Sequence, residues 1–231
     1  MKWNLREAAR ALDMTEREVL RFVREGTLPA SRIDDRYSFN PVEVQEWGAA
    51  RNRKMAPDVI PPNGEPPQML SLASAIARGG IHYDIAASTK NEVLDAVARL
   101  PGVPAHLDRA LLAEVLRTRE GLASTGIGGG IAIPHPRDPV VLHVETPIVL
   151  LCLLARGVDF EAIDGQPVRV LFTLLSPTIP LHLRVLSRLA HALHDDVLCQ
   201  LLAKRSAPEA ILARIRQLEI HMNGSVAEGG P

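Results

Sequence analysis

A glycine-rich segment that ends in a histidine between two prolines carries the residue types best suited to chemistry. Residues 124–137 read STGIGGGIAIPHPR. A residue that precedes proline is kept out of helical backbone, so we expect Ile133 and His135 in extended backbone. Glycines allow close approach, and successive backbone N–H groups in such a turn can bind an anion. The residues expected to line this phosphoryl-binding loop are Ser124, Thr125, Gly126, Gly128 and Gly129.

The imidazole of His135 is the candidate nucleophile. Histidine side chains in model peptides titrate at about pH 6.5, so neutral, nucleophilic imidazole is common near neutral pH. A rigidly held histidine beside an anion-binding loop suits a residue that accepts a phosphoryl group.

Two other phosphate-binding patterns do not fit the loop. It lacks the Gly-Lys-Ser/Thr ending of a Walker loop, and Gly126 and Gly128 are followed by Ile131 where the dinucleotide pattern needs a third glycine. We therefore expect no nucleotide cofactor.

The spacing of the histidines gives little support for a metal site. His135, His143 and His182 could be combined into a zinc site, but they show no metal-ligand spacing. His191 and His194 are three residues apart on a predicted helix and lack a convincing third ligand. We expect no metal cofactor and keep a zinc or acid–base hydrolase as a third alternative.

Composition indicates a soluble protein. The 231 residues are 46% hydrophobic and 3% aromatic, and the net charge of −1 does not indicate a nucleic-acid or membrane partner. No apolar run is long enough to span a membrane. Cys152 and Cys199 lie in apolar runs, and the charged N-terminus does not resemble a signal peptide. We therefore predict a cytoplasmic location, with the cysteines reduced.

A proline-rich segment divides the chain into two modules. Residues 51–69 contain five prolines and no apolar period, which favours an extended linker. We predict a first module at 1–50, a second at 70–219 and a disordered tail at 220–231.

The first module shows two short helices joined by a tight turn. Asn4 is a suitable N-cap for the first helix, and Thr15 with Glu18 forms a capping box for the second. Gly26 can end the second helix in a left-handed conformation. A hairpin with its turn at residues 34–35 follows, and then a third helix begins near Pro41.

This pattern resembles the excisionase/MerR-type winged helix-turn-helix family, over EAARALDMTEREVLRFVREGTLPASRI and YSFNPVEVQEW. The resemblance implies DNA binding by the second helix and the wing. The implied contacts are Arg17, Arg21, Arg24, Arg32 and Arg36. Residues 1–50 nevertheless hold eight Lys/Arg and nine Asp/Glu, whereas DNA-binding domains normally carry a basic face. Protein binding by this module remains an alternative, and we expect any DNA affinity to depend on a homodimer.

The second module alternates helix and strand patterns. The apolar runs TPIVLLCLLA and VRVLFTLLSP predict strands buried on both faces. Amphipathic helices are predicted before and after them, for example in TKNEVLDAVARL and HLRVLSRLAHALHD. The predicted fold is an α/β sandwich with a small mixed sheet flanked by helices, and the first module is a small winged helix-turn-helix domain.

The second module resembles the enzyme IIA domains of the bacterial sugar phosphotransferase system, of the fructose/mannitol type and its nitrogen-regulatory relatives. The motifs are REGLASTGIGGGIAIPH, GVDFEAIDGQPVRVLFTLLSP and HLRVLSRLAHAL. The resemblance implies that His135 receives a phosphoryl group from a small phosphocarrier protein (HPr-like), with His182 and Arg119 beside it. Family members usually have glycine where this chain has Pro136, which stiffens the loop and removes a backbone N–H.

These patterns predict a phosphotransferase that carries a phosphoryl group on His135 and serves regulation rather than sugar transport. Whether the phosphoryl group moves on to an acceptor stays open. The alternative is a DNA- or protein-binding transcriptional regulator in which the second module is only a sensor.

Overall fold

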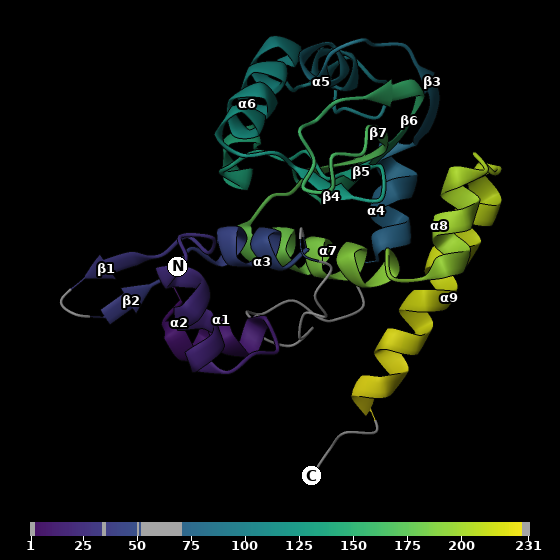
Figure 1. Cartoon of the computed structure of the whole chain (residues 1–231). Coiled ribbons are helices and arrows are strands. Elements are labelled where there is room, and N and C mark those ends of the chain that lie inside the picture. The colour runs from purple at the N-terminus through teal and green to yellow at the C-terminus, as the bar shows by residue number, and fades with distance from the viewer. Residues whose placement is uncertain (1–2, 34–35, 50, 52–70, 228–231) are drawn as a thin grey trace.

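The computed structural model describes residues 3–33, 36–49, 51 and 71–227. Its larger part is a five-stranded mixed sheet with strand order β3-β6-β7-β5-β4 (Figure 1). β6 pairs parallel with β3 and antiparallel with β7, while β5 pairs parallel with β7 and antiparallel with β4. The strands are β3 (Ile81–Ile85), β4 (Gly126–Gly128), β5 (Ile131–Ala132), β6 (Ile148–Val158) and β7 (Val168–Leu175). The predicted α/β sandwich is confirmed.

Helices cover both faces of the sheet, which is why its two long strands, β6 and β7, are mostly apolar and buried. Along β6, Leu150 and Cys152 face one core, whereas Leu151 and Leu153 face the other. The first core is closed by α5 (Lys90–Ala98) and α6 (Arg109–Leu122). The second is closed by α4 (Leu72–Gly79), α7 (Ile179–Ala192), α8 (Asp196–Ala203) and α9 (Pro208–Ala227).

Two strands were not predicted from the sequence. β3 lies at one edge of the sheet and keeps a partly exposed face, so its sequence IHYDI lacks the continuous apolar character of β6. β4 lies at the other edge and consists of the glycine-rich residues of the loop. The glycines of this strand are typical of turns, so the sequence did not predict a strand here. Its residues form a strand because they pair with β5.

The first module contains two helices, a hairpin and a third helix, in the predicted order. The elements are α1 (Leu5–Ala11), α2 (Glu16–Arg24), β1 (Ser31–Ile33), β2 (Arg36–Ser38) and α3 (Pro41–Ala49). Asn4 and Thr15 cap the two helices, each within a capping box, and Gly26 has a φ of 68°. These three predictions are confirmed. The hairpin turn predicted at residues 34–35 lies outside the described residues.

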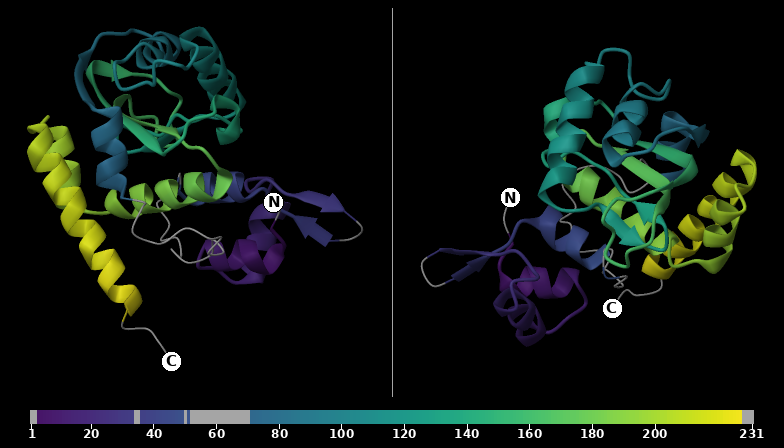
Figure 2. Two further views of the ribbon diagram at one scale, coloured as in Figure 1. Left: turned by 180° about the vertical axis from the view of Figure 1, so that it is seen from behind. Right: turned by 45° about the horizontal axis from the view of Figure 1, so that its top comes forward.

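The first module packs directly on α7 of the second. Trp3, Phe39, Val44 and Trp47 form a buried cluster that also contains Leu183 from α7. Figure 2 shows α3 beside α7 from two further directions, while α2 lies on the side of α3 turned away from the sheet and the β1–β2 hairpin projects to one side, clear of the sheet.

The C-terminal prediction needs correction. α9 continues to Ala227, so residues 220–227 are helical where a disordered tail was predicted. Each residue added to an existing helix gains a backbone hydrogen bond, which lets α9 extend beyond the buried Glu219. Most of the predicted linker, residues 52–69, lies outside the described residues. Within the described part of the chain, every helix is too short or too polar to cross a bilayer.

Candidate active site

His135 lies just beyond the end of β5, in a segment that belongs to no helix or strand. The N–H of Leu174 on β7 donates to the carbonyl of Pro134 at 3.0 Å, which keeps this segment alongside β7 after β5 has ended. The Nδ1 atom of His135 lies 2.7 Å from the carbonyl oxygen of Ile133. The imidazole is therefore anchored to its own strand.

The contact with Ile133 selects the tautomer of His135. A carbonyl oxygen only accepts hydrogen bonds, so Nδ1 must carry the proton that it donates. In the neutral ring the lone pair is then on Nε2, and Nε2 is the nitrogen that can attack an electrophile.

His182 meets His135 through the parallel pairing of β5 and β7. Parallel strands end at the same edge of the sheet, and α7 begins shortly after β7 with Thr178 as its N-cap. The ring centroids of His135 and His182 lie 5.1 Å apart, with an interplanar angle of 49°. Both side chains are buried, at 2% and 0% exposure respectively.

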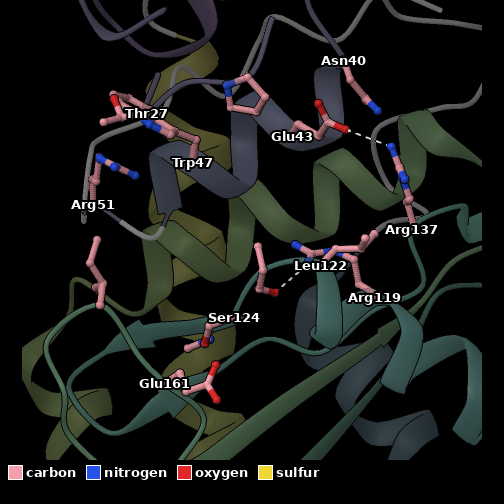
Figure 3. Close-up of a pocket in the computed structure, with 14 residues that line it drawn as sticks. Thr27, Asn40, Glu43, Trp47, Arg51, Arg119, Leu122, Ser124, Arg137 and Glu161 are labelled. Atoms are coloured by element: carbon pink, nitrogen blue, oxygen red, sulfur yellow. Dashed lines mark hydrogen bonds and ion pairs between the residues drawn. The ribbon is translucent and has the colours of Figure 1, made fainter. Parts of the chain in front are cut away.

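Arg119 lies in the last turn of α6 and is 7% exposed. Its guanidinium donates to the carbonyl of Ala123 at 2.8 Å, which holds it against the start of the glycine-rich loop. Arg119 lines a cavity of about 560 Å³ together with Ser124, Gly126 and Arg137 (Figure 3). The structure thus places Arg119 beside the loop and beside the residue two positions after His135.

The glycine-rich loop differs from the anion-binding nest that the sequence suggested. The N–H of Gly129 donates to the Asp164 carboxylate at 2.8 Å, and the N–H of Gly126 donates to the Ser124 hydroxyl at 3.0 Å. Hydrogen bonds from the N–H groups of Gln166 and Gly129 lower the pKa of Asp164, which favours its ionised form. Asp164 therefore supplies the anion at Gly129, where a phosphoryl group was expected.

Gly128 remains important for the shape of the loop, since its φ is 93°. Residues with a side chain rarely adopt this conformation.

Thr125 has a structural partner that the sequence did not suggest, the buried carboxylate of Glu120. Glu120 accepts hydrogen bonds from the backbone N–H of Thr125 at 3.1 Å and from its hydroxyl at 2.5 Å. This pair holds the chain between α6 and β4.

Two charged residues that the sequence analysis did not single out, Arg137 and Glu43, connect the modules. The guanidinium of Arg137 lies 3.6 Å from the carboxylate of Glu43 on α3. Arg137 lies two positions after His135 in the sequence, but nothing local could indicate a partner in the first module.

The predicted DNA-contacting arginines are only partly described. Arg17, Arg21 and Arg24 are exposed on α2, and Arg32 is exposed on β1. Arg36 opens β2. Glu25 lies 3.7 Å from the Arg21 guanidinium, so this face carries acidic side chains among the basic ones.

No group of three or more potential metal ligands of the His, Cys, Asp or Glu types gathers anywhere in the part of the chain that the structure describes.

Comparison with known proteins relates this site to a family. Residues 75–218 match the family model described as "Phosphoenolpyruvate-dependent sugar phosphotransferase system, EIIA 2". The chain is 37% identical over 147 residues to the nitrogen regulatory protein of Pseudomonas aeruginosa, covering 62% of this chain and 91% of the relative. It is 32% identical over 160 residues to that of Escherichia coli K12, covering 65% and 92%.

The fold also resembles a solved structure, the nitrogen regulatory protein IIA-Ntr from Neisseria meningitidis. The TM-score is 0.56 at 30% identity, over 62% of this chain and 98% of that one. The chain belongs to the EIIA 2 family of the phosphoenolpyruvate-dependent sugar phosphotransferase system, whose members act as phosphoryl carriers.

Proposed function

We propose that the protein accepts a phosphoryl group on Nε2 of His135 from a phosphocarrier protein (HPr-like). The observation that carries the proposal is the anchored imidazole: Nδ1 donates to Ile133, and the ring packs beside His182. The bond to Nε2 forms as the P–N bond of the donor phosphohistidine breaks. The donor nitrogen keeps the electron pair, and each imidazole keeps the proton on its other nitrogen.

The negative charge on the transferred phosphoryl group must be stabilised by nearby hydrogen-bond donors. Phosphoryl transfer depends mainly on positioning and on stabilisation of the equatorial oxygens. His182 lies beside the attacking ring, and Arg119 lines the adjoining cavity. We assign both to charge stabilisation, with His135 as the nucleophile.

The output is regulatory in this proposal. The relatives in P. aeruginosa and E. coli are named nitrogen regulatory proteins. Phosphorylation would add a charge of roughly −1.5 to −2 at His135. Such a change can alter which macromolecule binds to this face, whether or not the phosphoryl group is passed on.

The direct test incubates the full chain with a phosphoenolpyruvate-driven carrier system and measures intact mass. We expect one phosphoryl group, labile in acid and stable in base, on the parent protein and on a His143→Ala control in which an exposed histidine is removed. His135→Ala should take up none. Equal labelling of His135→Ala and the parent would disprove the assignment.

A second function is proposed for the first module, as a winged helix-turn-helix domain that contacts DNA. Its support is the position of α2 and the hairpin, which lie away from the sheet and carry exposed arginines. The alternative output is binding of a protein to the same face, with the EIIA 2 domain as sensor.

A further inference from the structure

The first module occupies a face of the EIIA 2 domain that lies next to the phosphoacceptor. Leu183 of α7 is buried in the core cluster of the first module, and Ile179 packs against that cluster. His182 lies between these two positions in the sequence and is fully buried. The helix that carries the supporting histidine is therefore also the helix on which the first module docks.

A polar contact joins the modules on the other side of the site. Arg137, two residues after His135, pairs with Glu43 of α3 at 3.6 Å. Figure 3 shows this pair at the edge of the cavity, with side chains of the first module on one wall and those of α6 and the loop on the other. Both anchors of the first module thus lie within a few residues of the two histidines.

The cavity between the modules includes the approach to Arg119. One wall is formed by Thr27, Trp47 and Arg51, and the opposite wall includes Arg119 and Ser124. Arg51 stacks over the Trp47 ring with its guanidinium carbon 4.4 Å from the centroid, so Trp47 is fixed at this boundary. A donor protein that must reach Arg119 and His135 needs the space that these side chains line.

Protein–protein interfaces typically bury about 800 Å² on each partner, so a donor protein must cover a surface wider than one side chain. His135 itself is 2% exposed. In-line transfer requires the donor phosphorus to come within bonding distance of Nε2, which a covered imidazole does not allow. The docked arrangement, in which His135 is covered and the first module lines the cavity beside Arg119, is therefore unfavourable for phosphoryl transfer.

We propose that the first module and the phosphocarrier protein compete for one surface, formed by Ile179, Leu183 and Arg137, and that phosphorylation of His135 favours the undocked module. This rests on the proposed phosphorylation of His135. A phosphoryl group there competes with Glu43 for Arg137 and repels the Glu43 carboxylate. Coupling is reciprocal, so release of the first module must also favour phosphorylation.

The test reverses the charge of the inter-module pair in the full chain. Both tryptophans of the protein, Trp3 and Trp47, lie in the first module, and Trp47 lines the cavity. Acrylamide quenching of tryptophan fluorescence therefore reports undocking independently of chemistry. Glu43→Arg should increase quenching and raise the rate of phosphorylation about fivefold, from loss of one exposed pair and addition of one repulsion.

Two further variants separate docking from local damage. Arg137→Glu should also increase quenching, and Glu43→Arg combined with Arg137→Glu should return quenching to the parent value. The control Glu16→Arg makes the same charge change on the exposed side of α2 and should alter neither readout. Phosphorylation of the parent should raise quenching, and the same treatment of His135→Ala should not.

The inference is overturned if Glu43→Arg matches the parent in quenching and in rate, or if the double variant fails to restore quenching. Absence of phosphorylation in every variant would instead reject the proposed function. In that case the quenching series still decides whether Glu43 and Arg137 hold the modules together.

Discussion

The rings of His135 and His182 lie 5.1 Å apart, although one follows a short strand and the other begins a helix in a later part of the chain. The neighbouring parallel strands β5 and β7 place both residues at one edge of the sheet. Because His135 donates from Nδ1 to Ile133, the lone pair of its neutral ring lies on Nε2, the nitrogen that we propose as the nucleophile. In the proposed function, this pair combines the nucleophile with a donor to the transferred group.

Replacing His182 by Ala should slow phosphorylation of His135 about ten- to a hundredfold, in line with the loss of one preorganised donor to a developing charge. Single-turnover transfer from a phosphorylated carrier protein measures the rate. His191→Ala, at the exposed end of the same helix, should keep the parent rate. An unchanged rate in His182→Ala would reduce His182 to a packing role.

Glu219 should be a major contributor to the stability of the EIIA 2 domain. Its buried carboxylate accepts from the Ser71 hydroxyl at 2.7 Å, from the Leu72 N–H at 2.5 Å and from Arg188 at 3.0 Å, which ties α9 to α4 and α7. Glu219→Ala leaves these donors without their acceptor and should lower the free energy of unfolding by about 2–4 kcal/mol. Urea denaturation followed by circular dichroism measures this.

The matched control for that variant is Glu209→Ala, an exposed position in the first turn of α9. Surface substitutions of this kind usually change stability by less than about 0.5 kcal/mol. If both variants unfold at the same urea concentration, the hydrogen bonds of Glu219 do not contribute measurably to the free energy of unfolding.

Asp195 should make stability depend on pH in the acid range. Its carboxylate accepts two hydrogen bonds from Arg214, at 2.8 and 2.6 Å, and this pairing lowers the pKa of Asp195 below its ordinary value of 3.8. A carboxyl group whose pKa is lowered by folding stabilises the protein above its unfolded pKa, and the stabilisation is lost as pH falls through the folded pKa.

The parent should therefore be more stable than Asp195→Asn at pH 7, and the difference should shrink as pH falls below the ordinary aspartate range. Urea midpoints measured from pH 7 down to about 3 test this expectation. Asp196→Asn, the neighbouring exposed aspartate, serves as the control. A difference that stays constant over the whole range would contradict the assigned pairing.

DNA binding by the full chain should be weak, with a shallow dependence on salt. Log affinity falls with log salt in proportion to the number of phosphates neutralised. The arginines of α2 are interspersed with Glu18 and Glu25, so few phosphates can approach them closely. Mobility-shift titrations at two salt concentrations measure the slope.

Arg17→Ala and Arg24→Ala should each reduce that slope by about one if the residue contacts a phosphate. Tight binding with a steep salt dependence would contradict the charge argument. No binding at any protein concentration tested would favour a protein partner for α2 and the hairpin.

Much of the fold could be predicted because its signals are local. The apolar runs of β6 and β7, the helix of residues 90–98, the N-cap at Asn4 and the capping box at Thr15 each depend on residues within one element. Edge strands lack such signals. β3 and β4 become strands only through their neighbours, so local composition did not reveal them.

The sequence by itself determined the local backbone around His135, because prolines on both sides of it restrict that backbone sterically, without any tertiary contact. Only the tertiary structure decided which residues surround it. His182 lies beside His135 because β5 and β7 pair in parallel. The N–H of Gly129 donates to the carboxylate of Asp164, and Arg137 pairs with Glu43 of the first module. Backbone sterics act between neighbours in the chain, whereas strand pairing and ion pairs join residues distant in sequence, and one sequence contains no local signal for them.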